Sequence, residues 1–228
     1  MDAVFLGMND AGENVYDWLN SREDVKVIAL LTEKEQLSLI KELEPEIVVS
    51  SGFEHKVPEE IIEVPDKGIV NLHPSYLPYN RGAHPYIWPI VEDTPAGVSV
   101  HYMSEEIDEG DIIDRKKVEV RPDDTAKTLR DRLMEEQTRI FIQNWGAVKE
   151  GAEGTGQNPD SGTTHYRGEL DEFSKLELDE EKTVGETIDK LRALTYPPQG
   201  LAYFERDGER FIVDINITPE KEIDQRSR

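Results

Sequence analysis

The sequence predicts an α/β fold with a mostly parallel sheet, followed by a small C-terminal unit of a helix and a β-hairpin. The first part is predicted because short apolar strand-like runs alternate with amphipathic segments, a pattern typical of parallel sheets covered on both faces. The second part is predicted because a helical pattern and two strand-like segments follow a stretch rich in Gly, Pro and Ser at 151–162.

The first part supplies most of the expected elements. Apolar runs and period-two alternation predict strands at 3–7, 25–31, 46–52, 68–73, 96–103 and 111–120. The run at 25–31 is expected to be buried. Helices are expected to begin at Asn9 or Asp10 and to cover 33–44 and 125–151. The helix at 33–44 should end before Pro45, because the residue before a proline avoids the helical conformation.

The composition change at 151 predicts a domain at 1–150 and a smaller subdomain, with its linker, at 151–228. A helix is expected at 183–195 and a hairpin turning at Asp207-Gly208. The exposed edge of that hairpin favours a homodimer.

The charge of the chain excludes several partners. Lys and Arg number 26 and Asp and Glu 49, so the formal net charge is −23. Such a surface repels nucleic acids and anionic membranes, and it is typical of a protein adapted to high salt, where screening relieves self-repulsion. The absence of cysteine excludes disulfides and thiolate sites. With neither a leader pattern nor a membrane-spanning run, we expect a cytoplasmic protein.

The turn after the first strand, GMNDAG at 7–12, allows two interpretations. It lacks the glycine spacing of a dinucleotide site and the Lys-Ser/Thr pair of a phosphate loop. It is either a tight strand-to-helix turn or an anion site formed by backbone amides at the helix N-terminus.

Asn71 and His73 are the first catalytic candidates. Residues two apart in a strand point to the same face, and Pro74 ends this strand at the edge where open α/β sheets place their sites. An amide and an imidazole at that edge could donate to one oxygen that gains negative charge. The alternative is a structural pair in a turn.

Asp108 is the third candidate. It lies in the acidic segment SEEIDEGDIID, which could fold over the same edge and bring a carboxylate to His73, although a solvated acidic turn is the simpler interpretation. A metal site from His73, His84, His101 and Asp108 is disfavoured because no pair has helical ligand spacing. His101 is interpreted as a half-buried strand histidine, and Ser75 is not in a nucleophile elbow.

Three segments in order are similar to one family. NLHPSYLPYNRG, TPAGVSVHYMSEEIDEGDII and RPDDTAKTL resemble the formyltransferases that use 10-formyltetrahydrofolate, which carry Asn-x-His-Pro-Ser-x-Leu-Pro, Gly-Val-Thr-Val-His and Asp-x-Gly-x-Ile-Ile at about this separation. The resemblance covers roughly residues 45–130. It implies a Rossmann-like formyltransferase fold and an enzyme that needs no metal.

The resemblance also implies residue roles. Asn71 and a protonated His73 would stabilise the oxyanion, and Asp108 would pair with His73 and help to remove the proton of the attacking amine. The 10-formyltetrahydrofolate would lie against two loops, whose residues are Gly52, Phe53, Glu54, His55, Lys56, Val57, Met103, Ser104, Glu105 and Ile107. The expected substrate-binding residues are Gly7, Asn9, Tyr79, Asn80, Arg81 and Gly82. Arg81 suits an anionic group, and a structural ion pair is its alternative.

The C-terminal part of the sequence indicates which amine accepts the formyl group. The family formylates methionyl-tRNA, glycinamide ribonucleotide or amino sugars linked to nucleotides. An acidic tail of about 70 residues, together with THYR at 164–167 and IDKLRALTYPPQGLAYF, resembles the sugar branch. We therefore expect a nucleotide-linked amino sugar. The alternatives are the other two acceptors and a non-catalytic relative that binds folate or a nucleotide sugar.

Overall fold

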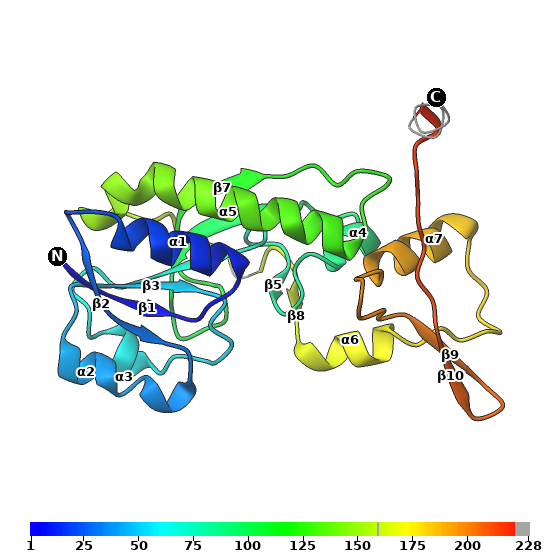
Figure 1. Ribbon diagram of the computed structural model, residues 1–228, viewed down its shortest axis with the longest axis horizontal. Helices are drawn as coiled ribbons and strands as arrows, with labels where there is room; N and C mark the ends of the chain where they lie inside the picture. Colours follow the sequence, from blue (N-terminus) through cyan, green and yellow to red (C-terminus); the bar gives the residue numbers. More distant parts are fainter. Residues whose placement is uncertain (159, 222–228) are drawn as a thin grey trace.

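The computed structural model describes residues 1–158 and 160–221 and has a six-stranded sheet at its centre (Figure 1). The strand order is β2-β1-β3-β4-β6-β7. The first four strands run parallel, β6 pairs antiparallel with β4, and β7 pairs antiparallel with β6. The predicted, mostly parallel α/β fold is therefore confirmed. The bounds are β1 Asp2–Leu6, β2 Lys26–Leu31, β3 Ile47–Ser51, β4 Ile69–His73, β6 Gly97–Tyr102 and β7 Ile112–Lys117.

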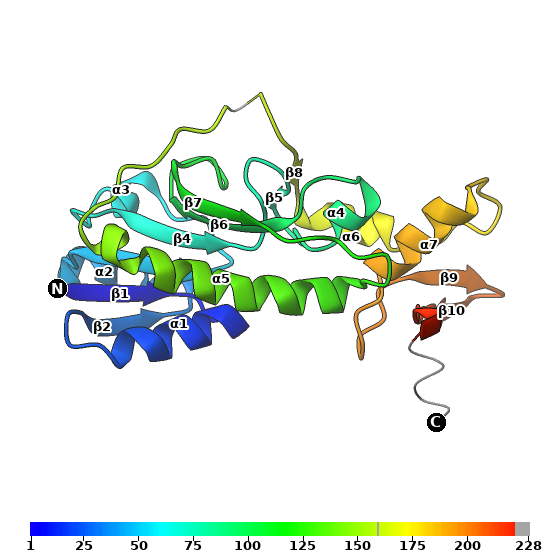
Figure 2. The same ribbon diagram turned by 90° about the horizontal axis from the view of Figure 1, so that it is seen from above.

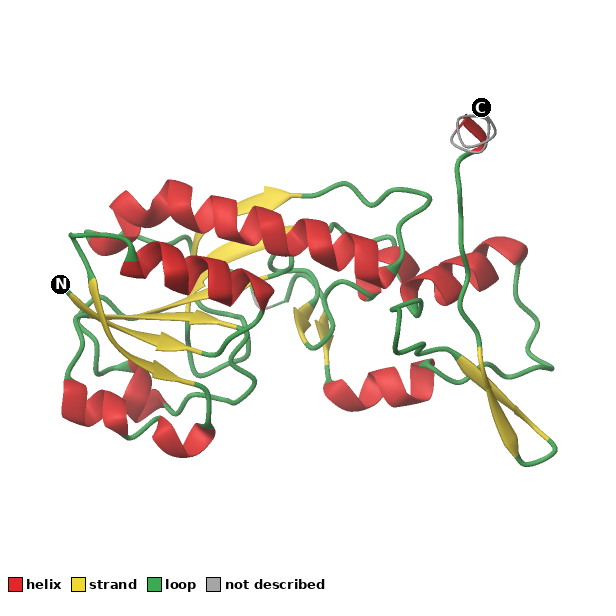
Figure 3. Ribbon diagram, in the orientation of Figure 1, coloured by secondary structure: helices red, strands yellow, loops and turns green. Residues whose placement is uncertain are grey.

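Helices cover both faces of this sheet, as Figures 1 and 3 show. One face carries α1 (Asp10–Asn20) and α5 (Ala126–Lys149), and the other carries α2 (Leu39–Leu43) and α3 (Glu59–Ile62). Each face has its own apolar cluster, and neighbouring residues of β1 contribute to both. Phe5 packs on the first face and the next residue, Leu6, packs on the second.

Two predicted elements differ from the structure. The expected helix at 33–44 is divided into a 3₁₀ helix, η1 (Lys34–Gln36), and α2. The Gln36 side chain accepts from the backbone N–H groups of Thr32 and Glu33, which closes η1 as a separate short turn. The expected burial of strand 25–31 is wrong for most of β2, where only Leu31 is fully buried. The reason is that β2 lies at an edge of the sheet.

The C-terminal unit lies beyond one end of the sheet and contains the predicted helix and hairpin (Figure 1). The hairpin turns at Asp207 and Gly208, both with positive φ, as a two-residue hairpin turn requires. Four short elements were not predicted, namely α3, α4, α6 and a two-stranded sheet of β5 and β8. The bounds are β5 Arg81–Gly82, α4 Trp88–Val91, β8 Thr164–His165, α6 Arg167–Phe173, α7 Val184–Ala193, β9 Tyr203–Arg206 and β10 Glu209–Ile212.

The segment between α5 and β8 crosses back over the molecule, as Figure 2 shows. Beside β7, Thr155 and Ile112 exchange two backbone hydrogen bonds of 2.8 and 2.9 Å. Further on, β8 pairs in parallel with β5, which places residues 164–165 against the first half of the chain. The segment is thus packed along its course. Residues 159 and 222–228 of the predicted subdomain lie outside the described residues. Within the described residues, no helix is long and apolar enough to cross a membrane.

Candidate active site

A cavity of about 980 Å³ opens where the parallel strands end. Its walls are the segments that follow β1, β3 and β4, the loop between β6 and β7, and parts of α5 and α6. The carboxyl ends of parallel strands are the usual position of sites in open α/β sheets.

Asn71 and His73 reach this cavity from β4, which ends at His73. Both lie on one face of the strand, whose intervening residue, Leu72, belongs to the core on the other face. The antiparallel neighbour β6 places His101 directly opposite Asn71, and the Asn71 Nδ2 atom lies 3.1 Å from His101 Nε2. The strand pairing therefore sets the position of the Asn71 amide.

Asp108 closes over this pair from the β6–β7 loop. One oxygen, Oδ2, is 3.5 Å from His73 Nδ1, and the other, Oδ1, is 3.5 Å from His101 Nε2. The backbone N–H of Gly82 donates to Oδ2 at 2.8 Å. The Asp108 side chain is only 13% exposed, so this carboxylate is not part of a solvated acidic turn.

The electrostatics of the cluster set two protonation states. Burial raises the pKa of Asp108, but the imidazoles of His73 and His101 lower it by more, so that the pKa lies well below its ordinary value. Burial also lowers the pKa of His73, and the charge of Asp108 offsets only part of this effect. At neutral pH Asp108 is therefore ionised and His73 is neutral. For the protonated His73 that the resemblance implies, burial is therefore unfavourable and the charge of Asp108 is favourable.

His101 belongs to the cluster, although the sequence indicated only a half-buried strand residue. It is 1% exposed, and its Nδ1–H donates to the Tyr102 carbonyl at 2.8 Å. This tautomer leaves Nε2 to accept a hydrogen from Asn71. The signal that could have found His101 was the register between two antiparallel strands, which alternation within one strand does not give.

The residues expected to bind the formyl donor surround one half of the cavity. The loop after β3 and the loop after β6 face each other there, and every one of the ten expected side chains or backbones lines the cavity. Phe53 and Met103 are partly buried against the apolar cluster beneath. We call this the donor half.

The residues expected to bind the acceptor behave differently. Among the described residues, Asn9 and Gly82 line the cavity, whereas Gly7, Tyr79, Asn80 and Arg81 do not. Asn9 turns its Oδ1 atom inward to accept from the Gly12 N–H and the Ser51 hydroxyl. This geometry favours the tight-turn interpretation of GMNDAG.

Asn80 and Arg81 are engaged inside the protein. Asn80 is fully buried and accepts hydrogen bonds from the hydroxyls of Thr94 and Thr163. Arg81 is 2% exposed, lies 3.6 Å from Glu109 and donates to Gln157. The structural ion pair, which was the alternative for Arg81, is thus the arrangement found, because β5 points this side chain away from the cavity.

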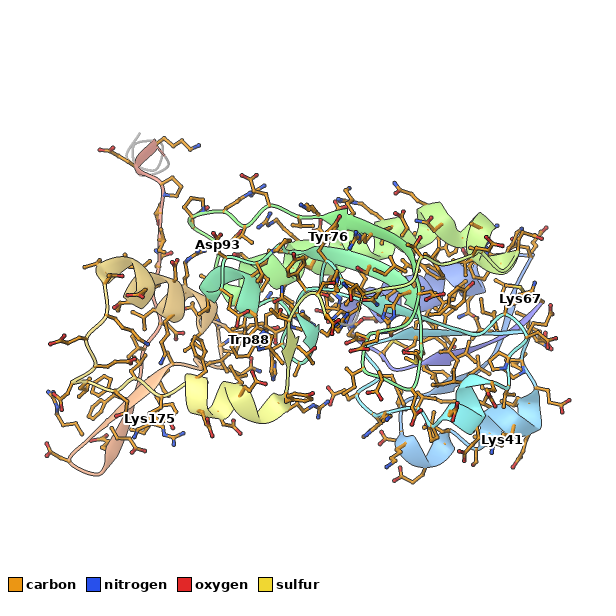
Figure 4. All side chains as sticks on the ribbon, turned by 180° about the vertical axis from the view of Figure 1, so that it is seen from behind. Lys41, Lys67, Tyr76, Trp88, Asp93 and Lys175 are labelled. Atoms are coloured by element: carbon orange, nitrogen blue, oxygen red, sulfur yellow. The ribbon has the colours of Figure 1, made fainter. Side chains whose placement is uncertain are left out.

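The other half of the cavity, the acceptor half, comes from segments that the sequence did not bring together. It is lined by residues around β5, from α5 and from the start of α6. His165 stacks on Trp88 with ring centroids 4.0 Å apart, and Figure 4 shows Trp88 between α4 and α6. The motif THYR was the available signal for this wall. Among the side chains that line this half are Tyr86, Arg130, His165 and Arg167.

Comparison with protein families assigns the chain. The model for formyl transferase matches residues 17–144, which is more than half of the chain. The chain belongs to the formyl transferase family. A second model, that of the N-formyltransferase dimerization C-terminal domain, matches residues 169–219. The family predicted from the sequence motifs is therefore confirmed, and with it an enzyme that transfers formyl groups.

This formyl transferase is similar to curated proteins of more than one acceptor class. It is 26% identical over 179 residues to the dTDP-4-amino-4,6-dideoxyglucose formyltransferase of Mycobacterium tuberculosis, covering 77% of this chain and 75% of that protein. It is 33% identical over 185 residues to the methionyl-tRNA formyltransferase of Sulfurihydrogenibium sp., covering 81% of this chain but only 58% of that protein.

Solved structures have the same fold. The formyltransferase PseJ from Anoxybacillus kamchatkensis, in complex with UDP-4,6-dideoxy-4-formamido-L-AltNAc and tetrahydrofolate, is 26% identical, with a TM-score of 0.69 and coverage of 85% of this chain and 98% of that one. A sugar N-formyltransferase from a Shewanella species is 22% identical, with a TM-score of 0.87 and coverage of 96% and 98%.

Proposed function

We propose that this formyl transferase moves the formyl group of 10-formyltetrahydrofolate to the amino group of a nucleotide-linked amino sugar. The observation that carries the proposal is the position of Asn71, His73 and Asp108, which lie between the donor half and the acceptor half of one cavity. The choice of acceptor is supported by similarity over 75% of the dTDP-4-amino-4,6-dideoxyglucose formyltransferase and 98% of the Shewanella sugar N-formyltransferase.

The donor half suits a flat, partly polar ring system. Its two loops present backbone N–H and C=O groups, which can pair with the edge of a heterocycle, and the apolar side chains of Phe53, Met103 and Ile107. 10-Formyltetrahydrofolate combines such a ring with an activated formyl group, which is the chemistry that it supplies when bound.

The acceptor half suits a nucleotide-linked sugar because its basic side chains could bind the phosphate oxygens of a diphosphate. Arg130 and Arg167 line this half, each beside one carboxylate: Arg130 lies 2.5 Å from Asp10, and Arg167 lies 2.9 Å from Glu54. Guanidinium groups are suited to bind phosphate oxygens in pairs. In a chain of net charge −23, such cations are the features that an anionic substrate needs.

The cluster can then carry out formyl transfer. As the amine nitrogen attacks the formyl carbon, the carbonyl oxygen gains negative charge, and Asn71 can donate its second amide hydrogen to it. His73 can take up the proton of the amine through a water molecule, and ionised Asp108 stabilises the resulting imidazolium. The bond between the formyl carbon and the donor nitrogen breaks, and that nitrogen receives a proton, which gives a formamide and tetrahydrofolate.

The other acceptors are less compatible with this chain. The matched region covers 58% of the methionyl-tRNA formyltransferase of Sulfurihydrogenibium, against 75% of the sugar enzyme of Mycobacterium tuberculosis. A tRNA would also meet an acidic surface, which opposes binding of its phosphates. A non-catalytic binding protein would have no need of a buried, ionised Asp108 beside two histidines.

The test is a panel of acceptors incubated with 10-formyltetrahydrofolate. The panel contains UDP- and dTDP-linked 3-amino and 4-amino sugars, glycinamide ribonucleotide and methionyl-tRNA, and tetrahydrofolate release is followed together with the mass of the acceptor. We expect a mass gain of one formyl group on a nucleotide-linked amino sugar. Formylation of the ribonucleotide or the tRNA alone would refute the acceptor, and binding of donor without turnover of any amine would refute the activity.

We further propose that the chain forms a homodimer through its C-terminal unit. Apolar side chains on α7 and β10 are exposed there, including Val184 (77% exposed) and Ile212 (55% exposed). The match to a dimerization domain over 169–219 supports this assignment. Sedimentation equilibrium of wild type and of Ile212→Glu measures it directly.

A further inference from the structure

Gln157 lies in the segment between α5 and β8, and its side chain reaches the loop that carries Asp108. We propose that Gln157 is a positioning residue for formyl transfer, which fixes the backbone of this loop so that the Asp108 carboxylate faces His73 and His101. This inference rests on the proposed function, since it assigns a role in that reaction, and one of its tests does not depend on turnover.

The contacts of Gln157 use its whole amide group. Its Nε2 atom donates to the backbone carbonyls of Asp108, at 2.8 Å, and of Gly110, at 2.7 Å. Its Oε1 atom accepts from Arg81 Nη2 at 3.2 Å. One side chain thus holds the two carbonyl groups on either side of Glu109, and no apolar residue of the same size could replace it.

The loop needs such support because of its backbone conformation. Asp108 has φ of +54°, in the left-handed region that residues with a Cβ atom rarely adopt unless their surroundings hold them there. On the other side only glycine fits at position 110, since a Cβ atom there would lie 1.9 Å from the Tyr102 carbonyl oxygen. The bonds to Gln157 join these two points and hold the turn between them.

The position of Gln157 is itself fixed by the segment around it. Thr155 is bridged to Ile112 at the start of β7, and the hydroxyl of Tyr102 donates to the Ala152 carbonyl at 2.7 Å. Gly154 runs so close to Asp111 that a Cβ atom would lie 2.5 Å from the Asp111 Cβ. Figure 2 shows this crossing, which brings Gln157 to the loop from 47 to 49 positions away.

Arg81 completes the arrangement. Its guanidinium is buried and binds both Gln157 and Glu109, the residue after Asp108. Its neighbour Gly82 donates the backbone hydrogen that reaches the Asp108 carboxylate. Through Arg81, β5 and the crossing segment therefore act on the same loop, one from each side.

The experiment compares Gln157→Ala and Gln157→Glu with Asn158→Ala. Gln157→Glu keeps an acceptor for Arg81 and removes both hydrogens donated to the loop. Asn158 is exposed, and its hydrogen bonds among the described residues stay within its own turn. We expect both Gln157 variants to lower kcat on the order of 10- to 100-fold, because displacement of a catalytic group by about 1 Å has effects of this size, while the KM values of both substrates change little. Asn158→Ala should match wild type.

A second measurement, the pKa of His73 followed by NMR in the free protein, needs no turnover. The charge of Asp108 raises the pKa of His73. If Asp108 is displaced, this effect weakens, so the pKa of His73 should be lower in both Gln157 variants than in wild type. The melting temperature shows whether each variant is folded. An unchanged His73 pKa, or a kcat equal to that of Asn158→Ala, would overturn the proposal. If wild type formylates no acceptor, the proposed function fails, and the NMR comparison still decides the role of Gln157.

Discussion

The two parts of the catalytic cluster are held in different ways. Asn71 and His73 lie on β4, an inner strand with hydrogen-bonded neighbours on both sides. Asp108 lies in a loop with a left-handed backbone, held by bonds from segments far away in the chain. The strand part is positioned by the same forces that build the core, whereas the loop part depends on a few polar contacts. The two parts should therefore respond differently to substitution.

The largest effect is expected in the loop part, from Asp108→Asn. The substitution keeps the size of the side chain and removes the charge that stabilises a protonated His73, so kcat should fall by about 10²- to 10⁴-fold, the range of acid–base contributions. The measurement is tetrahydrofolate release at saturating substrates. Asp111→Asn is the matched control, because Asp111 is exposed at the end of the same loop. Equal activity of the two variants would contradict a role for the Asp108 charge.

A slightly smaller effect is expected in the strand part, from Asn71→Ala. Removal of one hydrogen-bond donor to a developing oxyanion costs roughly 10²- to 10³-fold in kcat. Because β4 is held by its backbone, the melting temperature should change little, and Asn20→Ala on the exposed side of α1 is the control. A large rise of KM with unchanged kcat would mean that Asn71 binds substrate and does not stabilise the transition state.

The pH dependence of stability tests the link between the two parts. The pKa of His73 is lower in the folded protein than its unfolded value of about 6.5, so the unfolded chain binds the additional proton. Stability is therefore lost as the pH falls below about 6.5, and His73→Gln should remove part of this loss. Urea unfolding at pH 7.5 and at pH 5.5 measures the difference. Parallel curves for wild type and variant would contradict a buried, neutral His73.

The smallest effect is expected on stability, from a substitution in α5, the helix that packs against β4. Gln137 is fully buried on α5, which packs against β4 and β6, and its two amide atoms have no hydrogen-bond partner within the described part of the chain. Gln137→Met keeps the shape and removes the unpaired groups, so it should stabilise the protein by about 1 kcal/mol with kcat unchanged. Leu133→Ala, one turn away, should destabilise it. Loss of stability in Gln137→Met would indicate a bound partner for the amide.

The same difference explains which residues could be predicted from the sequence. Asn71 and His73 were found from a local rule, the alternation of side chains in a strand that Pro74 ends. Asp108 required the family resemblance, since its charge alone indicates a solvated loop. His101 was missed because its role depends on the pairing of two strands, and the sequence of each strand does not contain their register.

Arg81 and the crossing segment show the same limit more strongly. Arg81 was assigned to a substrate because its chemistry suits an anion, but its partner Gln157 lies 76 positions further along the chain. The stretch at 151–162 was interpreted as a linker or loop from its Gly, Pro and Ser content, and one of its glycines, Gly154, allows close approach to Asp111. Contacts between distant polar residues follow no periodic pattern, so neither could be foreseen.

The crossing segment also affects the order in which the protein becomes active. The sheet and its helices are complete once α5 has formed, but Thr163 and Gln157, which hold Asn80 and the Asp108 loop, follow α5 in the chain. Contacts between residues 83 positions apart form late, because a long loop must close first. A nascent chain that ends at residue 150 would therefore have a complete sheet and an unfixed Asp108, and would acquire its catalytic geometry only with the next fifteen residues.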